Sequence, residues 1–179
     1  MSSTRNKGFT LIEVLVVLTI LSFLTSILIL YSRGGEGQIL LFREQSKLVS
    51  DVLRAKSLAI QTFQTQEKVC GYGVHFEMAP YNTYVIFKEF KGIDPNNPCG
   101  ANNRRYDAGE EFEPATNLGD YGMKIDQATI GDVFFQPPDP RIYFDGLQAS
   151  GEARITLMSI DGVALATVVI GSGGQVSTQ

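Results

Sequence analysis

Few residues of this 179-residue chain have the types and spacing that catalysis requires. His75 is the only histidine, and its neighbours Val74 and Phe76 suit a strand rather than a metal cluster or a catalytic triad. Glu110 and Glu111 are adjacent, but adjacent acids in a loop are usually solvated rather than arranged for acid and base catalysis. The sequence contains no phosphate-binding loop, nucleophile elbow, CxxC or HExxH motif. It therefore predicts a protein that is not an enzyme.

The carboxylate of Glu13 is the one group that needs a functional explanation. Glu13 is the only charged residue between Phe9 and Ser32, and this segment contains no Gly or Pro. A helix of that length crosses a hydrocarbon core of about 30 Å, in which a carboxylate costs about 2.5–3.5 kcal/mol on insertion scales. Glu13 therefore indicates a role in which a positive group, from the same chain or a neighbour, neutralises the carboxylate.

Three ordinary explanations of the apolar segment compete: a signal peptide, a single-pass anchor and a buried core helix. The segment ends at Leu30–Arg33 without the small-residue pattern of a signal-peptide cleavage site. A core helix in a small domain is rarely apolar on all sides. An anchor agrees with Arg5 and Lys7, which favour a cytoplasmic N-terminus and an external C-terminal part. None of the three explains Glu13.

The stretch Lys7-Gly8-Phe9-Thr10-Leu11-Ile12-Glu13-Val14, followed by the apolar segment, resembles the class III signal of type IV prepilins and type II secretion pseudopilins. The resemblance implies a leader peptide of residues 1–8, which a prepilin peptidase removes by cutting between Gly8 and Phe9. It implies that the same enzyme methylates the new N-terminus at Phe9. Glu13 becomes the glutamate at the fifth mature position, where it sets the register of assembly or docks onto a neighbour's N-terminus.

The rest of the chain divides into a helix and a β domain, which gives an α+β fold of the pilin type. Residues 9–32 are expected to form the transmembrane and filament-core half of a long helix. Residues 33–66 are expected to form the amphipathic second half of the helix. Three glycines within Arg33–Gly37, at the start of this half, predict a break between the two halves. The apolar face of this half is predicted to consist of Leu41, Leu48, Val52, Ala55, Ala59 and Phe63.

Residues 67–179 are expected to form an exported β-rich globular domain. Strands that follow one another without helices between them predict a mainly antiparallel sheet, packed against the long helix. Asp161-Gly162 between two apolar runs is a strong hairpin signal. Asp51–Ile60 followed by Val69–Val74 is similar, more weakly, to GspH/FimT-type minor subunits. The candidate strands are 69–76, 83–90, parts of 123–135, 142–145, 154–160, 163–170 and 174–178.

Cys70 and Cys99 form an even pair on the side of the membrane that the basic leader predicts to be oxidising. A disulfide between them would close a loop of about 30 residues and stabilise the domain by about 2–4 kcal/mol. The alternative is two unrelated thiols, one of them buried in a strand.

The polar segment 91–122 contains oxygen ligands near glycine, which suits a hard cation such as calcium. The ligand order of an EF-hand fails, because Pro98 and Cys99 occupy the positions of a ligand and the glycine. A solvated surface loop is therefore favoured, and no cofactor is predicted. The weak calcium candidates are Asp94, Asn96, Asp107 and Glu110.

The charge balance argues against nucleic acid as a partner. The chain has 15 Lys and Arg against 19 Asp and Glu, a net charge of −4, and loss of Arg5 and Lys7 with the leader makes it more acidic. Some FimT-type pilins bind DNA through arginines near the C-terminus, but residues 171–179 contain no basic residue. Phosphate binding needs such contacts.

Together these patterns predict a structural subunit, a pilin or minor pseudopilin of a type IV pilus or type II secretion pseudopilus, which polymerises through its N-terminal helix. The expected partners are the prepilin peptidase, other subunits of a helical filament, an inner-membrane assembly platform and, before assembly, the lipid bilayer. The expected location is the cytoplasmic (inner) membrane, single-pass with the C-terminal domain outside, and later an extracellular or periplasmic filament. The alternative is a pilus-tip binding module, an adhesin or DNA receptor, on the same stem.

Overall fold

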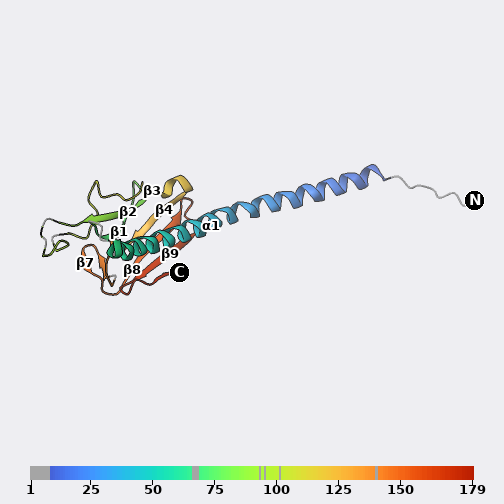
Figure 1. The fold of residues 1–179 in the computed structure, drawn as a ribbon. Helices are drawn as coiled ribbons and strands as arrows, with labels where there is room; N and C mark the ends of the chain where they lie inside the picture. Colours follow the sequence, from blue (N-terminus) through green and yellow to red (C-terminus); the bar gives the residue numbers. More distant parts are fainter. Residues whose placement is uncertain (1–8, 66–68, 93, 95, 101, 140) are drawn as a thin grey trace, which may run out of the picture. The chain divides into compact units, whose positions relative to one another are not determined.

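The computed structural model describes residues 9–65, 69–92, 94, 96–100, 102–139 and 141–179. Within these residues the chain has one long helix, ten strands and one short 3-10 helix (Figure 1). It forms two units, the first ending at Gly37 and the second running Gln38–Gln179. The helix α1, Leu11–Thr65, contributes residues to both.

The 55 residues of α1 form one uninterrupted helix. Its backbone is helical through Arg33–Gly37, where the sequence predicts a break. Each glycine costs about 1 kcal/mol relative to alanine in a helix but can still adopt helical dihedral angles. The good helix formers on both sides therefore carry the helix across the glycines in this structure.

The part of α1 that belongs to the second unit buries the face that the sequence predicts. Five of the predicted positions are fully or almost fully buried: Leu41, Leu48, Val52, Ala55 and Ala59. The side chain of Phe63 lies outside the described residues. Because these positions repeat every three or four residues, they form one stripe along the helix and pack it against the β domain.

The β domain contains two antiparallel sheets. The six-stranded sheet has the order β3-β2-β1-β5-β6-β7, with bounds Thr116–Asn117, Thr83–Phe90, Val69–Glu77, Asp132–Gln136, Arg141–Phe144 and Leu147–Gln148. The four-stranded sheet has the order β10-β9-β8-β4, with bounds Val176–Thr178, Leu165–Gly171, Glu152–Ser159 and Met123–Ala128. The helix η1 spans Leu118–Tyr121. All paired strands are antiparallel, as predicted.

One hydrophobic core joins α1 to both sheets. Val52 of α1, Val74 of β1 and Ile155 of β8 belong to the same buried cluster. Successive residues of a strand point to opposite faces, so Val133 of β5 joins this core while the next residue, Phe134, lies in a second cluster on the other face of the six-stranded sheet. That second face is also covered, by the long loop between β2 and β3.

The predicted hairpin forms between β8 and β9. Gly162 has φ 73°, the left-handed conformation that this turn requires. The carboxylate of Asp161 accepts a hydrogen bond from the backbone N–H of Val163 at 3.1 Å. The strand predicted at 83–90 has its predicted ends, and the other predicted strands are present with shifted ends. The candidate region 123–135 contains two strands, β4 and β5, which belong to different sheets. Among the described residues, the sequence patterns missed the short elements β3, β7 and η1.

Candidate functional site

Thr10 and Glu13 form a capping box at the first turn of α1. The backbone N–H of Glu13 donates to Thr10 Oγ1 at 3.3 Å, and the backbone N–H of Thr10 donates to Glu13 Oε2 at 3.4 Å. The Thr10 hydroxyl also donates to the same carboxylate oxygen. Thr10 was not among the predicted site residues, although the spacing Thr-x-x-Glu before an apolar run is the signal of this cap.

The capping box places the Glu13 carboxylate at the N-terminal end of the helix. This end carries the positive pole of the helix dipole, which stabilises a nearby negative charge. Glu13 lies four residues after Phe9, whose side chain is exposed. Gly8 lies outside the described residues, so the structure gives no geometry for the predicted cleavage site.

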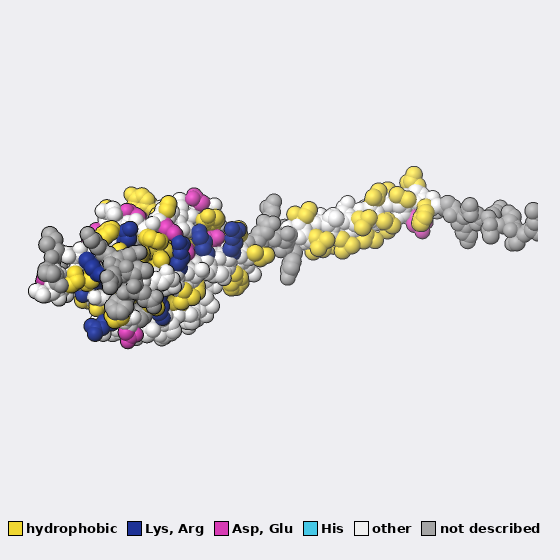
Figure 2. Space-filling model, in the orientation of Figure 1, with side chains coloured by type: hydrophobic (Ala, Val, Ile, Leu, Met, Phe, Trp, Pro, Cys, Tyr) yellow, Lys and Arg dark blue, Asp and Glu magenta, His cyan; other side chains and the backbone are white. Residues whose placement is uncertain are grey.

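The apolar side chains of the N-terminal part of α1 are exposed. Leu11–Ile29, 19 residues, is long and apolar enough to cross a membrane. Its large hydrophobic side chains are exposed, and Figure 2 shows hydrophobic atoms along this segment. Exposure of an apolar surface of this size to water is energetically unfavourable. The segment therefore needs lipid, or the same surface of another protein chain, as a partner.

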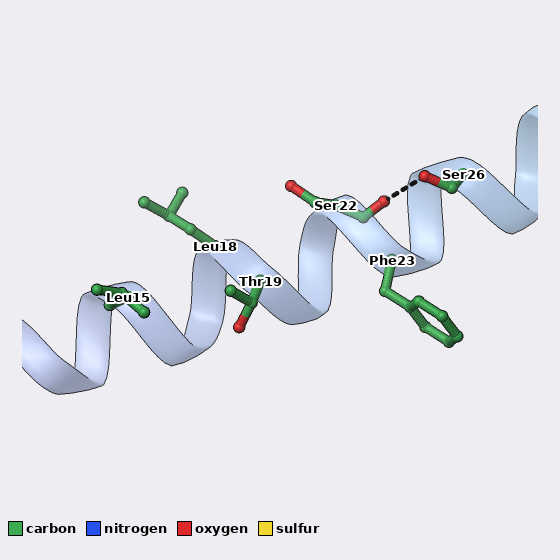
Figure 3. Close-up of a pocket in the computed structure, with 6 residues that line it drawn as sticks. All are labelled: Leu15, Leu18, Thr19, Ser22, Phe23 and Ser26. Carbon is green, nitrogen blue, oxygen red and sulfur yellow. Dashed lines mark hydrogen bonds between the residues drawn. The ribbon is translucent and has the colours of Figure 1, made fainter.

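The hydroxyl groups of Thr19, Thr25 and Ser26 in this segment donate to backbone carbonyls of the helix. Thr19 Oγ1 donates to the carbonyl of Val16 at 2.8 Å, and Ser26 Oγ donates to the carbonyl of Ser22 at 2.8 Å. Thr19, Ser22 and Ser26 line a shallow depression with Leu15, Leu18 and Phe23 (Figure 3). The three bonded hydroxyl groups therefore do not prevent the segment from entering an apolar environment.

The predicted disulfide is present. Cys70 in β1 is bonded to Cys99 in the loop after β2, and their Cα atoms are 5.6 Å apart. The bond ties the long loop to the start of β1, 29 residues away along the sequence. The alternative of two free thiols is wrong.

Of the four weak calcium candidates, Asp94, Asp107 and Glu110 accept local hydrogen bonds with their carboxylates, and Asn96 donates one with its backbone N–H. Asp94 Oδ1 accepts from the backbone N–H of Asn96 at 2.9 Å, and Glu110 Oε2 accepts from that of Asp107 at 3.0 Å. Among the residues described, no group of three or more Asp, Glu, His or Cys side chains is placed to hold a metal ion. The carboxylates of Asp94, Asp107 and Glu110 thus form no such group.

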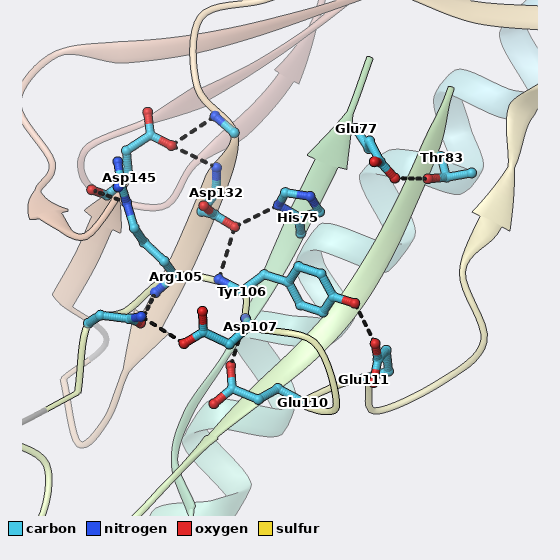
Figure 4. A network of polar contacts seen from close by, with 12 residues as sticks. His75, Glu77, Thr83, Arg105, Tyr106, Asp107, Glu110, Glu111, Asp132 and Asp145 are labelled. Atoms are coloured by element: carbon cyan, nitrogen blue, oxygen red, sulfur yellow. Dashed lines mark hydrogen bonds and ion pairs between the residues drawn. The ribbon is translucent and has the colours of Figure 1, made fainter. Parts of the chain in front are cut away.

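His75 and Asp132 anchor the long loop to the six-stranded sheet (Figure 4). His75 Nδ1 lies 2.9 Å from Asp132 Oδ1, which also accepts from the backbone N–H of Tyr106 at 3.2 Å. The His75 ring stacks on the Tyr106 ring, with centroids 4.7 Å apart. Asp132 Oδ1 and one ring face of His75 are thus engaged in holding the loop.

Carboxylates beneath and within this loop have perturbed pKa values. Glu89 is buried and accepts from the backbone N–H of Arg104 at 2.7 Å, and its burial raises its pKa. Burial also raises the pKa of Glu110. The hydroxyl of Tyr106 donates to the carboxylate of Glu111, which raises the pKa of Tyr106 to about 12 and lowers the pKa of Glu111.

Residues 3–29 match the family model of the prokaryotic N-terminal methylation motif. No curated protein and no solved structure matches the chain. The matched stretch contains Gly8, Phe9 and Glu13, the residues that carry the predicted resemblance. With the apolar helix, the match is consistent with the type IV pilin and pseudopilin family, which is structural rather than enzymatic.

The matched motif has three direct implications. It implies processing by a prepilin peptidase and assembly with other pilin subunits. Together with the apolar segment Leu11–Ile29 it indicates a membrane-anchored, single-pass protein.

Proposed function

We propose that this chain is a structural subunit, a pilin or minor pseudopilin, of a type IV pilus or type II secretion pseudopilus. Prepilin peptidase removes residues 1–8 and methylates Phe9, and the subunit then polymerises through α1. The observation that carries the proposal is the methylation motif at residues 3–29, joined directly to a helix with an uncovered apolar surface.

The uncovered apolar surface supports a subunit with two successive environments. In the bilayer, lipid covers the side chains of Leu11–Ile29. In a filament, the same side chains cover those of neighbouring helices. Since lipid and a helix bundle are both apolar, transfer between them needs no large desolvation step for this segment. The bilayer anchor thereby becomes the core of the polymer.

Glu13 then acts after processing. Cleavage before Phe9 creates an amino group four residues from Glu13, and a charged amine and a carboxylate attract strongly in apolar surroundings. The capping box already directs the Glu13 carboxylate to the N-terminal end of the helix. The amine that pairs with it comes from the N-terminus of a neighbouring subunit, so the pair sets the register between subunits.

The experiment that tests this function follows the subunit into fibres. Cells that carry the chain naturally are sheared, and the subunit is quantified in the sheared fraction and in the membrane fraction. In wild-type cells we expect a processed subunit in sheared fibres. A Gly8→Leu variant should keep its leader and remain in the membrane. A subunit that is processed normally and never enters a fibre would contradict the proposed function.

A further inference from the structure

One end of the β domain carries six exposed apolar side chains. Three turns meet there and are joined by backbone hydrogen bonds: Leu118 N–H donates to the carbonyl of Asn82 at 3.0 Å, and Ile160 N–H donates to that of Gly122 at 2.9 Å. We call this surface the apolar rim. It consists of Met78, Tyr81, Tyr121, Ile160, Val163 and Leu165.

The rim lies at the end of the second unit where α1 enters it. Lys47, near the start of this part of α1, lies over the Tyr121 ring at 5.2 Å. Gln45 Nε2 donates to the carbonyl of Thr167, two residues after Leu165, whereas Lys56 Nζ donates to that of Gly174. Moving along β9 away from the rim therefore means moving along α1 away from its N-terminus.

The length of the connecting chain keeps this end of the domain close to the bilayer. Eight residues separate Ile29, the last residue of the candidate membrane span, from Gln38, the first residue of the second unit. Even a fully extended chain of that length reaches only about 30 Å. Whatever the orientation of the two units, the end of the second unit where α1 enters it, which carries the rim beside Lys47, therefore meets the bilayer at a high effective concentration.

The chemistry of the rim fits the boundary between headgroups and acyl chains. Val163 is 73% exposed and Tyr81 is 63% exposed, so both protrude from turns. Tyrosine is favoured at membrane interfaces because its ring is apolar and its hydroxyl is polar. Asp120 and Asp161 share this end with Lys47, so attraction to anionic lipids would be weak and insertion of apolar groups would dominate.

We infer that the apolar rim docks onto the lipid bilayer and holds the β domain against the membrane surface while the subunit is anchored. The inference rests on the membrane-anchored state in the proposed function, but it assigns a second lipid contact to the globular domain. It follows that the rim must leave the bilayer when the subunit enters a fibre.

The test uses tryptophan as a depth probe, because the chain contains none. Full-length Tyr81→Trp and Phe90→Trp variants are placed in nanodiscs of phosphatidylcholine, part of it brominated at a shallow acyl position. Both residues are exposed aromatics, and Phe90 is 49% exposed. Tyr81 lies just before the first residue of β2, whereas Phe90 is the last residue of that strand. A Phe23→Trp variant, in the middle of the candidate span, reports insertion of the stem separately.

We expect quenching at Tyr81→Trp to exceed that at Phe90→Trp about twofold or more, since only the rim reaches the acyl boundary. Adding Ile160→Ser and Val163→Ser to the Tyr81→Trp protein should reduce this quenching towards the Phe90→Trp level.

Quenching at Phe23→Trp with equal, weak quenching at the other two positions would overturn the docking and leave the anchored stem intact. No quenching at Phe23→Trp would contradict stem insertion, and with it the docking. A third outcome is an emission shift of Tyr81→Trp that occurs only when a disc holds several protein copies and is not accompanied by lipid quenching. This outcome would assign the rim to contact with a second copy of the chain and overturn the inference.

Discussion

Thr10 and Glu13 hydrogen-bond to each other in both directions at the start of α1: the backbone N–H of each residue donates to the side chain of the other. The glutamate that the motif assigns to assembly is therefore also part of a helix cap. These two roles are separable, because glutamine can serve in a capping box but carries no charge.

Replacing Glu13 distinguishes the two roles. Glu13→Ala should leave membrane insertion intact and reduce incorporation into fibres more than about tenfold, because an unpaired amine in an apolar core costs several kcal/mol. Glu13→Gln should fail to the same extent if the charge is what matters. The measurement is the amount of subunit in sheared fibres relative to the membrane fraction. Normal yield from Glu13→Ala would refute the register role, and a defect in Glu13→Ala alone would assign Glu13 to the cap.

The disulfide should contribute substantially to the stability of the β domain. We expect the double variant Cys70→Ala, Cys99→Ala to lower the free energy of unfolding by about 2–4 kcal/mol, because the bond limits the freedom of the unfolded chain. Chemical denaturation of the full chain in detergent, followed by circular dichroism, measures this difference. Reduction of the wild-type protein should reproduce it. An unchanged midpoint in both cases would show that the loop is held by its other contacts.

Gly73 in β1 is required by close packing. A Cβ atom there would lie 2.5 Å from the Phe87 ring and from the carbonyl oxygen of Val133. Gly73→Ala should therefore lower the free energy of unfolding by about 2 kcal/mol or more.

Gly151 provides the control for this prediction. It has φ 82° and no neighbouring atom within 4 Å of an added Cβ, so Gly151→Ala should cost about 1 kcal/mol from backbone strain alone. The same denaturation experiment compares the two variants. Equal effects would contradict the packing argument.

The buried Glu89 should make the domain less stable as pH rises. Burial raises its folded-state pKa above the ordinary value of 4.5, so its stabilising contribution is fully present below the unfolded pKa and is lost as pH rises through the folded pKa. Glu89→Gln should therefore weaken the decrease in thermal midpoint between pH 4.5 and pH 7. Glu77→Gln, on the exposed end of β1, is the matched control. A steeper decrease in Glu89→Gln than in the wild type would reverse the assigned direction.

Local patterns predicted much of this fold. Leu48, Val52 and Ala55 were identified by helical spacing, and the Asp161-Gly162 turn by its residue types, because both signals lie within a few residues of sequence. The break predicted at Arg33–Gly37 is absent from the structure, since glycine weakens a helix without forbidding it.

The loop after β2 was not predictable in the same way. Its anchor joins Tyr106 to Asp132 and His75, which are 26 and 31 residues away, and no local pattern connects them. The sequence therefore predicted a solvated loop where the structure places Tyr106 against Phe87 and Phe134 on the outer face of the sheet. At the N-terminus, in contrast, the spacing of Thr10 and Glu13 is the sequence pattern of a capping box. The cap was therefore predictable from local sequence, although it was not predicted.

The most direct test of the central claim is the mass of the N-terminal peptide of the mature protein, taken from cells that carry it naturally. Processing at Gly8 followed by methylation predicts a peptide that begins at Phe9 and carries one additional methyl group on its N-terminal amine. A mature protein that retains Met1 or any other residue of the segment 1–8 would contradict processing at Gly8 and, with it, the assembly role assigned to Glu13.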